Sequence, residues 1–435
     1  MKFYIFLFFT FSFTYAASSQ KTCPKGFSLF KNKKCLKFNP EYLGHREAEA
    51  DCRTYGGHLV TAKNAIDNRA LSDMASNHGL PYIWMGMFCF GNSTSQCYLD
   101  DESGPLKYDN FKAGFPRIDK ERSGCVFMET LGNDIGKWST SPCEWEGLQY
   151  VCEVPTTVAD PDPSCTHNYN GYCYYPSHEM NISQISRSFY ATLDVCHTHS
   201  MELVSIHSRS ENDYIKNLYF HTGIHQIFLG AHADVPHQFS WTDGSKFDFE
   251  NMDPLSTSSG SCLSLTVAGR DDIGMWAEFG CLEIGEFMCK RKAEESTVVE
   301  DKEERKDVNP KFQMVQKDSP PPQHLDLSSH CNETLYLAPG VITSLSYPTM
   351  PPHLSFCTWK VAALGQYRLG IYYTDFSVYK PVTIYSSNGT VLSIDQYDRK
   401  PFKVLAPDNM VTITHDNTFD ASYNNHGFSA TVLPF

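Results

Sequence analysis

The chain has 435 residues, of which 41% are hydrophobic and 20% are charged, and its formal net charge is -14. A chain of this length holds about two to four domains, and its apolar content is high enough for packed cores, which excludes a wholly disordered protein. The negative charge repels nucleic acid on average, and no run of Lys or Arg offsets it, so nucleic acid is not an expected partner.

The N-terminus has the pattern of a secretory signal. Lys2 is followed by an apolar run from Phe3 to Phe13 and then by the small residues Ala16 and Ala17. The run is shorter than the ~20 residues of a membrane span, so residues 1–17 are expected to be a signal peptide rather than a buried helix. We therefore expect a secreted, extracellular protein without a membrane span.

Two low-complexity stretches divide the rest of the chain into three units. Residues 154–164 contain three prolines and are expected to form an extended linker. Residues 292–329 combine a mixed-charge run with three consecutive prolines and lack an apolar stripe, which is typical of a flexible spacer. Folded units are expected at 22–153, 165–291 and 330–435.

The first two units are repeats of each other. Matching residues recur at an offset of 144 in the first part of each unit and of 137–138 in the last part. In the first unit the matched residues are Cys52, Leu59, Val60, Asn68, Gly79, residues 83–86, Cys125, Trp138, Cys143 and Cys152. Their counterparts in the second unit, in the same order, are Cys196, Leu203, Val204, Asn212, Gly223, residues 227–230, Cys262, Trp276, Cys281 and Cys289. This number of coincidences indicates a tandem duplication with loop changes in between.

Each repeat is expected to contain two helices and a small antiparallel sheet, which makes an α+β fold. The first helix of the first repeat carries Cys52 and ends at residues 56–57, which are both glycine. In the second repeat, residues 208–211 form a capping box that opens the second helix, and residues 64–67 are the weaker counterpart. Gly79 and Gly223 are expected to end these helices, because glycine readily takes the left-handed conformation.

Both repeats resemble the C-type lectin-like domain. That family has a helix-borne cysteine, a Leu-Val strand, a second helix, a Trp-Ile-Gly-Leu-like core strand, a long loop and a closing Cys…Trp…Cys…Cys series. Residues 83–86 (IWMG) and 227–230 (IFLG) match the core strand, and residues 136–138 (GKW) and 274–276 (GMW) precede the last two cysteines. The resemblance covers about 130 residues in each repeat and implies a lectin-like fold twice.

The resemblance also implies a disulfide pairing, which cysteine counting alone leaves open. The implied pairs are Cys23–Cys35, Cys52–Cys152, Cys125–Cys143, Cys165–Cys173, Cys196–Cys289 and Cys262–Cys281. Cys89 and Cys97 remain and are expected to pair locally, since they lie eight residues apart after the core strand.

The third unit has a different pattern. Apolar residues alternate at 367–373, 382–385 and 411–414, which favours an antiparallel sandwich. The segment resembles the CUB domain, with Cys331–Cys357 as its first disulfide, although the second disulfide of that family is missing. The family's calcium site is not matched either, because Lys380 stands where an aspartate is expected after Asp375.

Sugar-binding members of the lectin family use calcium, which takes about six to eight oxygen ligands. The first repeat has Phe115-Pro116-Arg117 in place of the family's Glu-Pro-Asn loop and Ser139-Thr140 in place of Asn-Asp, so no metal site is expected there. In the second repeat, Asp253-Pro254-Leu255 and Ala277-Glu278 leave Asp253 and Glu278 as candidates for weak calcium and ligand binding. No other cofactor is expected.

The sequence favours binding over catalysis. It contains no hydrolase, metalloprotease or nucleotide-binding motif, so no enzyme activity is expected. Four sequons are candidate glycosylation sites: Asn92, Asn181, Asn332 and Asn388.

The architecture resembles that of secreted invertebrate lectin-like proteins. This implies recognition of an extracellular glycan or glycoprotein, with microbial surfaces in innate defence as the favoured target. The alternative is an extracellular protein–protein interaction or matrix protein that uses the lectin fold only as a scaffold. The sequence does not indicate an oligomeric state.

Overall fold

The computed structural model describes most of the three expected units. The described residues are 21–118, 124–143, 147–158, 165–180, 182, 187–269, 272–293, 331–332, 336–348, 355–365, 367–378, 380–386, 389–394, 401–417 and 426–435. The expected signal peptide at 1–17 lies outside them, as do residues 159–164 and 294–329 of the expected linkers.

Two helices flank the sheet of the first repeat. Helix α1 (His45–Thr54) buries Ala48 and Cys52 against that sheet. Helix α2 (Ala65–Asn77) begins after Asn64, whose side chain accepts a hydrogen bond from the Asp67 N–H over 2.9 Å. Gly79 follows α2 with φ of 73°, so this helix ends where the sequence predicts.

The strands of the first repeat form one large sheet and one short ribbon. They are β1 (Lys21–Thr22), β2 (Ser28–Phe30), β3 (Lys34–Leu43), β4 (His58–Leu59), β5 (Tyr82–Cys89), β6 (Cys97–Leu99), β7 (Cys125–Glu129), β8 (Trp138–Ser141), β9 (Leu148–Pro155) and β10 (Thr157–Val158), with a short 3-10 helix η1 (Thr94–Gln96). The sheet order is β2-β3-β9-β5-β7-β8, with β4 beside β9 and β6 beside β5, while β1 pairs with β10. Within this sheet β5 runs parallel to β9. Trp84 on β5 and Trp138 on β8 are fully buried, so both lie in the core.

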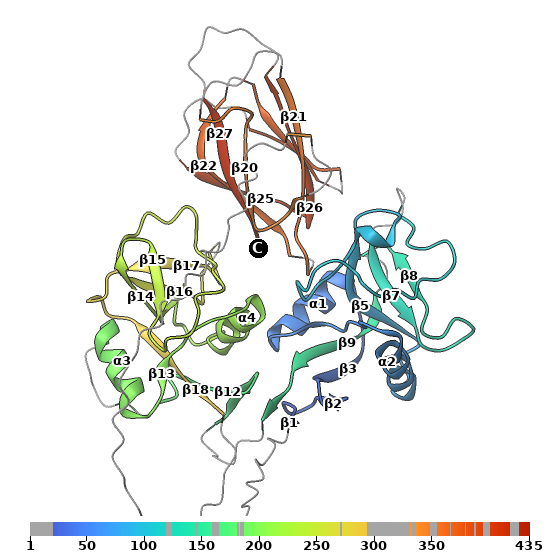
Figure 1. Cartoon of the computed structure of the whole chain (residues 1–435), viewed down its shortest axis with the longest axis horizontal. Coiled ribbons are helices and arrows are strands. Elements are labelled where there is room, and N and C mark those ends of the chain that lie inside the picture. The colour runs from blue at the N-terminus through green and yellow to red at the C-terminus, as the bar shows by residue number, and fades with distance from the viewer. Residues whose placement is uncertain are drawn as a thin grey trace, which may run out of the picture.

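The second repeat has the same topology. Its elements are β11 (His167–Tyr169), β12 (Tyr172–Pro176), α3 (Phe189–Thr198), β13 (Glu202–Leu203), α4 (Arg209–Leu218), β14 (Gln226–Val235), β15 (Gln238–Trp241), β16 (Cys262–Thr266), β17 (Trp276–Phe279) and β18 (Glu286–Lys292). The sheet order β11-β12-β18-β14-β16-β17 repeats that of the first unit, including one parallel pair, β14 with β18. The duplication that the offsets indicate is therefore present in the fold, and the two repeats lie on either side of Figure 1.

Helix α4 differs from the prediction at its end. It begins after Ser208, whose hydroxyl accepts the Glu211 N–H over 3.1 Å, as the capping box predicts. It ends at Leu218, however, five residues before Gly223. After Leu218 the N–H groups of Tyr219, Phe220 and Thr222 bond to carbonyls three residues back, and His221 takes a positive φ of 69°, so the chain leaves the α-helix before it reaches Gly223.

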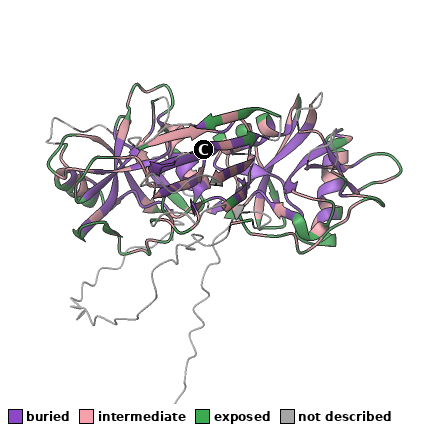
Figure 2. Ribbon diagram, turned by 90° about the horizontal axis from the view of Figure 1, so that it is seen from above, coloured by how far each residue is buried: buried purple, intermediate pink, exposed green. Residues whose placement is uncertain are grey.

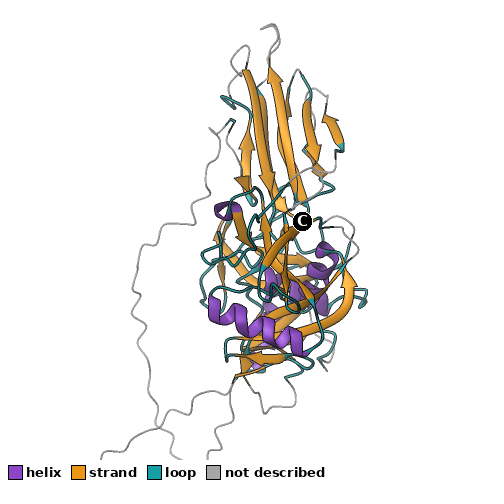
Figure 3. Cartoon of the chain, turned by 90° about the vertical axis from the view of Figure 1, so that its right-hand side faces the viewer, coloured by secondary structure: helices purple, strands orange, loops and turns teal. Residues whose placement is uncertain are grey.

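The third unit is a sandwich of two sheets. Its strands are β19 (Tyr336–Leu337), β20 (Gly340–Thr343), β21 (Ser355–Ala362), β22 (Leu369–Ser377), β23 (Val382–Ser386), β24 (Val391–Ile394), β25 (Phe402–Leu405), β26 (Met410–Asn417) and β27 (Gly427–Pro434). The sheets have the orders β19-β21-β26-β23-β24 and β20-β27-β22-β25. Trp359, Tyr373 and Phe428 come from both sheets and lie in one buried core. Figure 3 shows these strands without a helix among them, above the helices of the repeats.

Eight disulfides join all sixteen cysteines. They are Cys23–Cys35, Cys52–Cys152, Cys89–Cys97, Cys125–Cys143, Cys165–Cys173, Cys196–Cys289, Cys262–Cys281 and Cys331–Cys357. These are the pairs that the family resemblances and the local spacing imply. Two of them, one in each repeat, connect the first helix to the last strand of the sheet across 100 and 93 residues.

The three units meet at one junction. Helices α1 and α4 lie side by side between the repeats (Figure 1), where the Asn217 amide donates to the Arg53 carbonyl over 3.1 Å. The sandwich inserts Tyr367, which is 4% exposed, between the two repeats. Its hydroxyl donates to Asp213 over 2.9 Å, and the Arg53 guanidinium lies 4.0 Å from its ring centre. Buried residues continue through all three units in Figure 2.

Candidate functional site

In both repeats a buried asparagine on the second helix makes the same pair of hydrogen bonds. The Asn68 side chain accepts the Trp138 indole N–H over 2.8 Å and donates to the Gly136 carbonyl over 2.9 Å. Asn212 makes the same two bonds to Trp276 and Gly274, over 2.8 and 2.9 Å. Each asparagine is buried and gives a buried indole N–H its acceptor, while Asn110 and Asn251 of the long loops donate to the same two glycine carbonyls over 2.7 Å. The two loops are therefore built on one common base.

In the first repeat, the residues that replace calcium ligands pair with each other. The Thr140 hydroxyl accepts the Arg117 backbone N–H over 3.0 Å and donates to the Arg117 carbonyl over 2.7 Å. Thr140 is 3% exposed, so its oxygen is committed to the loop rather than open to an ion. The two segments that the sequence analysis singled out are thus neighbours, and a backbone–hydroxyl contact lies between them.

In the second repeat, Glu278 is the counterpart of Thr140 and has its own partners. Its carboxylate contacts His237 and accepts the Gly260 N–H over 3.3 Å. The Glu278 residue is 8% exposed, whereas 79% of the His237 side chain is exposed. The Glu278 carboxylate thus already holds a neighbouring imidazole and a loop N–H.

The sequence places Asp253 at the family's Glu-Pro-Asn position of the loop, but the structure places it earlier in the loop. Its N–H donates to the Trp276 carbonyl over 2.8 Å, as the Lys112 N–H donates to the Trp138 carbonyl over 2.9 Å. Asp253 is therefore the counterpart of Lys112 and precedes the counterpart of Arg117. Its carboxylate accepts the Leu255 N–H over 3.0 Å. Among the described residues, neither Asp253 nor Glu278 belongs to a cluster of three or more potential metal ligands.

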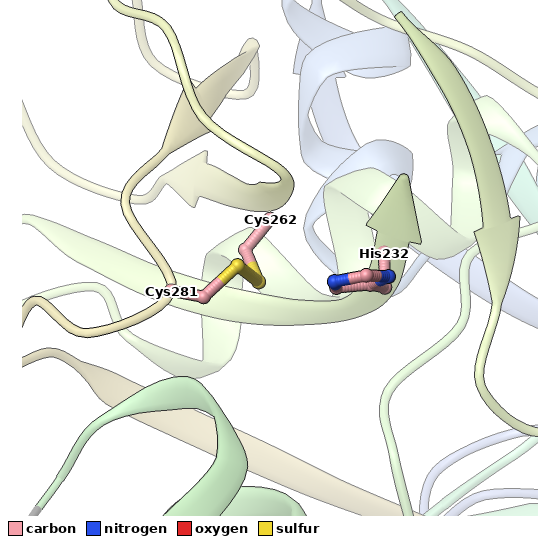
Figure 4. A group of neighbouring side chains, drawn as sticks. All are labelled: His232, Cys262 and Cys281. Atoms are coloured by element: carbon pink, nitrogen blue, oxygen red, sulfur yellow. A yellow bond between two sulfur atoms is a disulfide. The ribbon is translucent and has the colours of Figure 1, made fainter. Parts of the chain in front are cut away.

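One cluster in the described residues does combine three such side chains, and the chemistry of its sulfurs excludes a thiolate metal site. The possible ligand atoms of His232, Cys262 and Cys281 lie within 4.8 Å of one another, and Figure 4 shows the three side chains. The two cysteines form a disulfide, so neither offers the thiolate that binds metal. The His232 imidazole instead contacts the Tyr190 hydroxyl over 3.2 Å and Asp234 over 3.4 Å.

A Ser–His–Asp arrangement in the second repeat was not anticipated from the sequence. His207 contacts Asp248 through Nδ1 over 2.8 Å, and its Nε2 lies 3.1 Å from the Ser205 and 3.3 Å from the Ser245 hydroxyl oxygen. Both hydroxyls, however, donate to the Asp243 carboxylate, over 2.6 and 2.5 Å. Burial alone would raise the pKa of Asp243, but these bonds lower it below the usual value. The serine protons thus point away from the imidazole, and the arrangement holds the loop without forming an activated nucleophile.

The first repeat contains a cavity where the second has this network. Its volume is about 230 Å³, and its lining combines four apolar residues with polar ones: Ala62, Lys63, Leu99, Ser103, Pro105, Leu106, Lys107 and Tyr108. The Lys63 ammonium donates to Asp101 over 2.6 Å and to Ser103 over 3.2 Å. No local sequence pattern pointed to this cavity, because its lining comes from three separate stretches of the chain.

The wall of this cavity continues into the junction of the three units. Asp100 is fully buried, and one of its oxygens accepts the Gly365 N–H of the sandwich over 3.2 Å. Its second oxygen has no partner among the described residues. Burial and the neighbouring charge of Glu49 raise the pKa of Asp100 well above its usual value. Beside it, burial alone would lower the pKa of His58, but the hydrogen bond to Glu49 and its charge raise it to about 9.

Comparison with known proteins supports this reading of the fold. The profile of the "Lectin C-type domain" matches residues 43–154 and 185–291, one stretch in each repeat. C-type lectin domain-containing protein 38 of Caenorhabditis elegans is 32% identical over 284 residues, which cover 64% of this chain and 70% of that protein. The chain belongs to the C-type lectin domain family.

More distant members of the family share only part of their length with this C-type lectin. Human C-type mannose receptor 2 is 24% identical over 278 residues, which cover 59% of this chain and 18% of the receptor. Among solved structures, human lithostathine is 24% identical and covers 30% of this chain and 98% of its own, with a TM-score of 0.26. The two lectin-type repeats that the sequence predicts are confirmed by the family profile, which matches each of them once.

Of the other predicted features of this C-type lectin, two sequons can be placed. Asn92 and Asn332 are exposed, while Asn181 and Asn388 lie outside the described residues. Within the described residues, none of the helices has the length and apolar character that a membrane crossing needs.

Proposed function

We propose that this chain is a secreted C-type lectin that recognises carbohydrate or glycoprotein outside the cell, on microbial surfaces in innate defence. Membership of a family with a named mannose receptor among its members supports carbohydrate as the ligand class. Eight disulfides support an extracellular location, since such bonds persist in oxidising compartments. We also propose residues 330–435 as a CUB-like domain, on the strength of its two-sheet sandwich.

Recognition is proposed to proceed without the classical calcium bridge. The observation that carries this proposal is the contact between Thr140 and Arg117, which occupies the region of the first repeat where calcium ligands would stand. Calcium in the second repeat is proposed to be weak at most. Asp253 and Glu278 provide far fewer than about six oxygens, and Glu278 already accepts from His237 and Gly260.

A glycan array tests the function directly. The purified full chain is applied in calcium and again in a chelator, and the bound glycans are compared. Spots that persist in chelator support calcium-independent recognition. Spots that vanish would overturn it and return the classical bridging mechanism, while a blank array would favour the alternative, a protein-binding or scaffold role.

Calcium affinity is tested separately by thermal melts of the full chain across a calcium titration. Because stabilisation grows with the logarithm of ligand concentration over Kd, weak binding at Asp253 raises the melting temperature only at millimolar calcium. Asp253→Ala is expected to abolish that rise. A rise at micromolar calcium would contradict the proposal.

A further inference from the structure

The cavity of the first repeat exists because of one difference between equivalent positions. The Asp100 N–H donates to the Gly86 carbonyl over 2.9 Å, and the Thr242 N–H donates to the Gly230 carbonyl over 2.7 Å. The residues just before them, Leu99 and Trp241, are therefore counterparts. Trp241 is 3% exposed and packs on Phe247 with ring centres 5.0 Å apart. Leucine in place of this tryptophan leaves the first repeat with open space.

The size of the cavity limits its ligand to one small ring. Its volume of about 230 Å³ exceeds the ~150 Å³ cavity that accepts benzene in an engineered protein. It falls below the ~300 Å³ at which pockets for drug-sized molecules begin. A single six-membered ring, partly open to solvent, fits this range. The apolar floor of Leu99 and Leu106 suits the carbon face of such a ring.

The polar lining is arranged for an acidic group. Lys63 is held in place by Asp101 and Ser103, with half of its side chain exposed. The Lys107 ammonium has no hydrogen bond or ion pair among the described residues, and it is exposed beside the cavity. Tyr108 also lines the cavity, and its phenol is protonated at neutral pH like that of any tyrosine. Lys107 thus supplies the cation that is unpaired among the described residues beside the cavity, while the Lys63 ammonium already pairs with Asp101.

The wall of the cavity is fixed before any ligand arrives. Glu102 accepts a hydrogen bond from Arg209 of the second repeat over 2.9 Å, and Arg209 is 7% exposed. Asp100 is held by the Gly365 N–H of the sandwich. Both neighbouring units therefore hold the segment that forms one side of the cavity. A preformed wall lowers the entropic cost of binding.

We propose that this cavity binds a single acidic sugar unit, a pyranose ring that carries a carboxylate, at the end of a glycan. This assignment rests on the proposed function and narrows its ligand class. The net charge of -14 disfavours long polyanionic chains, which the molecule repels as a whole, and leaves a single acidic unit as the fitting ligand. In the second repeat, Trp241 stands in place of Leu99 and His207 in place of Lys63.

The test is a ligand-detected NMR titration of the full chain in chelator. The probes are methyl β-D-glucuronide and the neutral methyl β-D-glucoside. The wild-type chain is expected to bind the acid about tenfold more tightly than the neutral sugar, because a hydrogen bond to a charged group is stronger than one between neutral groups. Equal affinity for the two probes would overturn the proposal.

Three variants locate the binding. Leu99→Trp places the second repeat's own residue in the cavity and should abolish binding. Lys107→Gln alters an exposed side chain, leaves the fold intact, and should remove most of the tenfold preference. Lys246→Gln, an exposed change in the second repeat, should change nothing. Undiminished binding of the acid by both Leu99→Trp and Lys107→Gln would place the site elsewhere and overturn the proposal.

The outcomes separate this inference from the proposed function. If the Leu99→Trp variant binds neutral glycans on the array as the wild type does, the cavity assignment is overturned and the lectin function is kept. Binding of the free glucuronide with a blank array would support the cavity and remove glycan recognition.

Discussion

The two repeats of this C-type lectin share a base and differ in what stands on it. Asn68 and Asn212 make the same pair of hydrogen bonds to a buried tryptophan and a glycine carbonyl. Above that base, the first repeat has a cavity at Leu99, while the second fills the equivalent space with Trp241 and Phe247. The two repeats have thus kept the asparagines of the common base and differ in the residues that line or fill this space.

One pair of equivalent positions in the two repeats carries charges of opposite sign. Glu153 in the first repeat is the counterpart of Lys290 in the second. Glu153 accepts the Thr61 N–H over 2.8 Å and pairs with Lys34, whereas Lys290 donates to the Ser205 carbonyl over 2.9 Å and pairs with Glu211 over 2.7 Å. The charge is reversed, yet each site has one carboxylate and one ammonium. The fold therefore requires a satisfied pair at this place rather than a particular residue.

The largest effect is expected from the long-range disulfides. Replacing Cys52 and Cys152 with alanine, or Cys196 and Cys289, should lower the stability of the affected repeat by about 4–5 kcal/mol in each case. Both bonds close loops of similar length, and the chain-entropy model gives such loops similar values. Urea denaturation followed by tryptophan fluorescence measures both. A small loss in one pair only would show that the repeats differ in their reliance on this bond.

The reversed charge pairs offer a way to break the comparison. Lys290→Met should cost about 3–5 kcal/mol, because it leaves the Glu211 carboxylate buried without its partner. Lys34→Met should cost clearly less. The Lys34 and Glu153 side chains are 19% and 13% exposed, against 5% and 6% for Lys290 and Glu211. Equal losses in urea denaturation would mean that solvent access does not set the cost.

The shared asparagines sharpen the comparison. Asn68→Ala and Asn212→Ala should each cost about 1–3 kcal/mol, because each leaves a buried indole N–H without its acceptor, while the glycine carbonyl keeps Asn110 or Asn251 as donor. The same denaturation experiment applies, with Asn64→Ala at an exposed helix start as the control of smaller effect. A loss confined to one repeat would contradict a common base.

The smallest effect concerns pH and the junction. The pKa of Asp100 is raised above its unfolded value by burial and by Glu49, so its protonated form favours the folded state. The stability it contributes is present at low pH and is lost as pH rises through the raised pKa. Asp100→Asn should remove this loss, so the melting temperature falls less between pH 5 and pH 8 than in the wild type, while the fall that comes from the raised pKa of His58 remains.

Asp101 is the matched control for that measurement. Burial alone would raise the pKa of Asp101, but hydrogen bonds from Lys63 and Ser103 lower it. Its contribution is therefore present at neutral pH and is lost on acidification, the opposite sign. If Asp101→Asn and Asp100→Asn changed the pH profile in the same way, the opposite pKa shifts assigned to these two carboxyl groups would be contradicted.

Most secondary-structure elements could be predicted from the sequence, because the patterns that indicate them are local or periodic. The cysteine offsets, the capping residues Asn64 and Ser208, and the alternating strands of the third unit each predicted elements that the structure contains. The end of α4 was misplaced, because His221, which carries no glycine signal, already takes a positive φ two residues before Gly223.

The candidate site was harder to predict, because it depends on contacts between distant segments. The cavity follows from the volume of Leu99 against Trp241, which a loop sequence does not reveal without knowing that the two are counterparts. Tyr367 reaches Asp213 across 154 residues and a different unit, so no motif marks the junction. Asp253 was aligned by its proline neighbour, although backbone bonds make it the counterpart of Lys112.

Glycan-array binding of the full chain in chelator, with wild type and Leu99→Trp measured side by side, tests the central claim most directly. The claim is that the first repeat recognises sugar through its own cavity and without calcium. The account predicts that wild type keeps its acidic-glycan spots in chelator and that Leu99→Trp loses them. Loss of the wild-type spots on chelation, or equal binding by the variant, would contradict it.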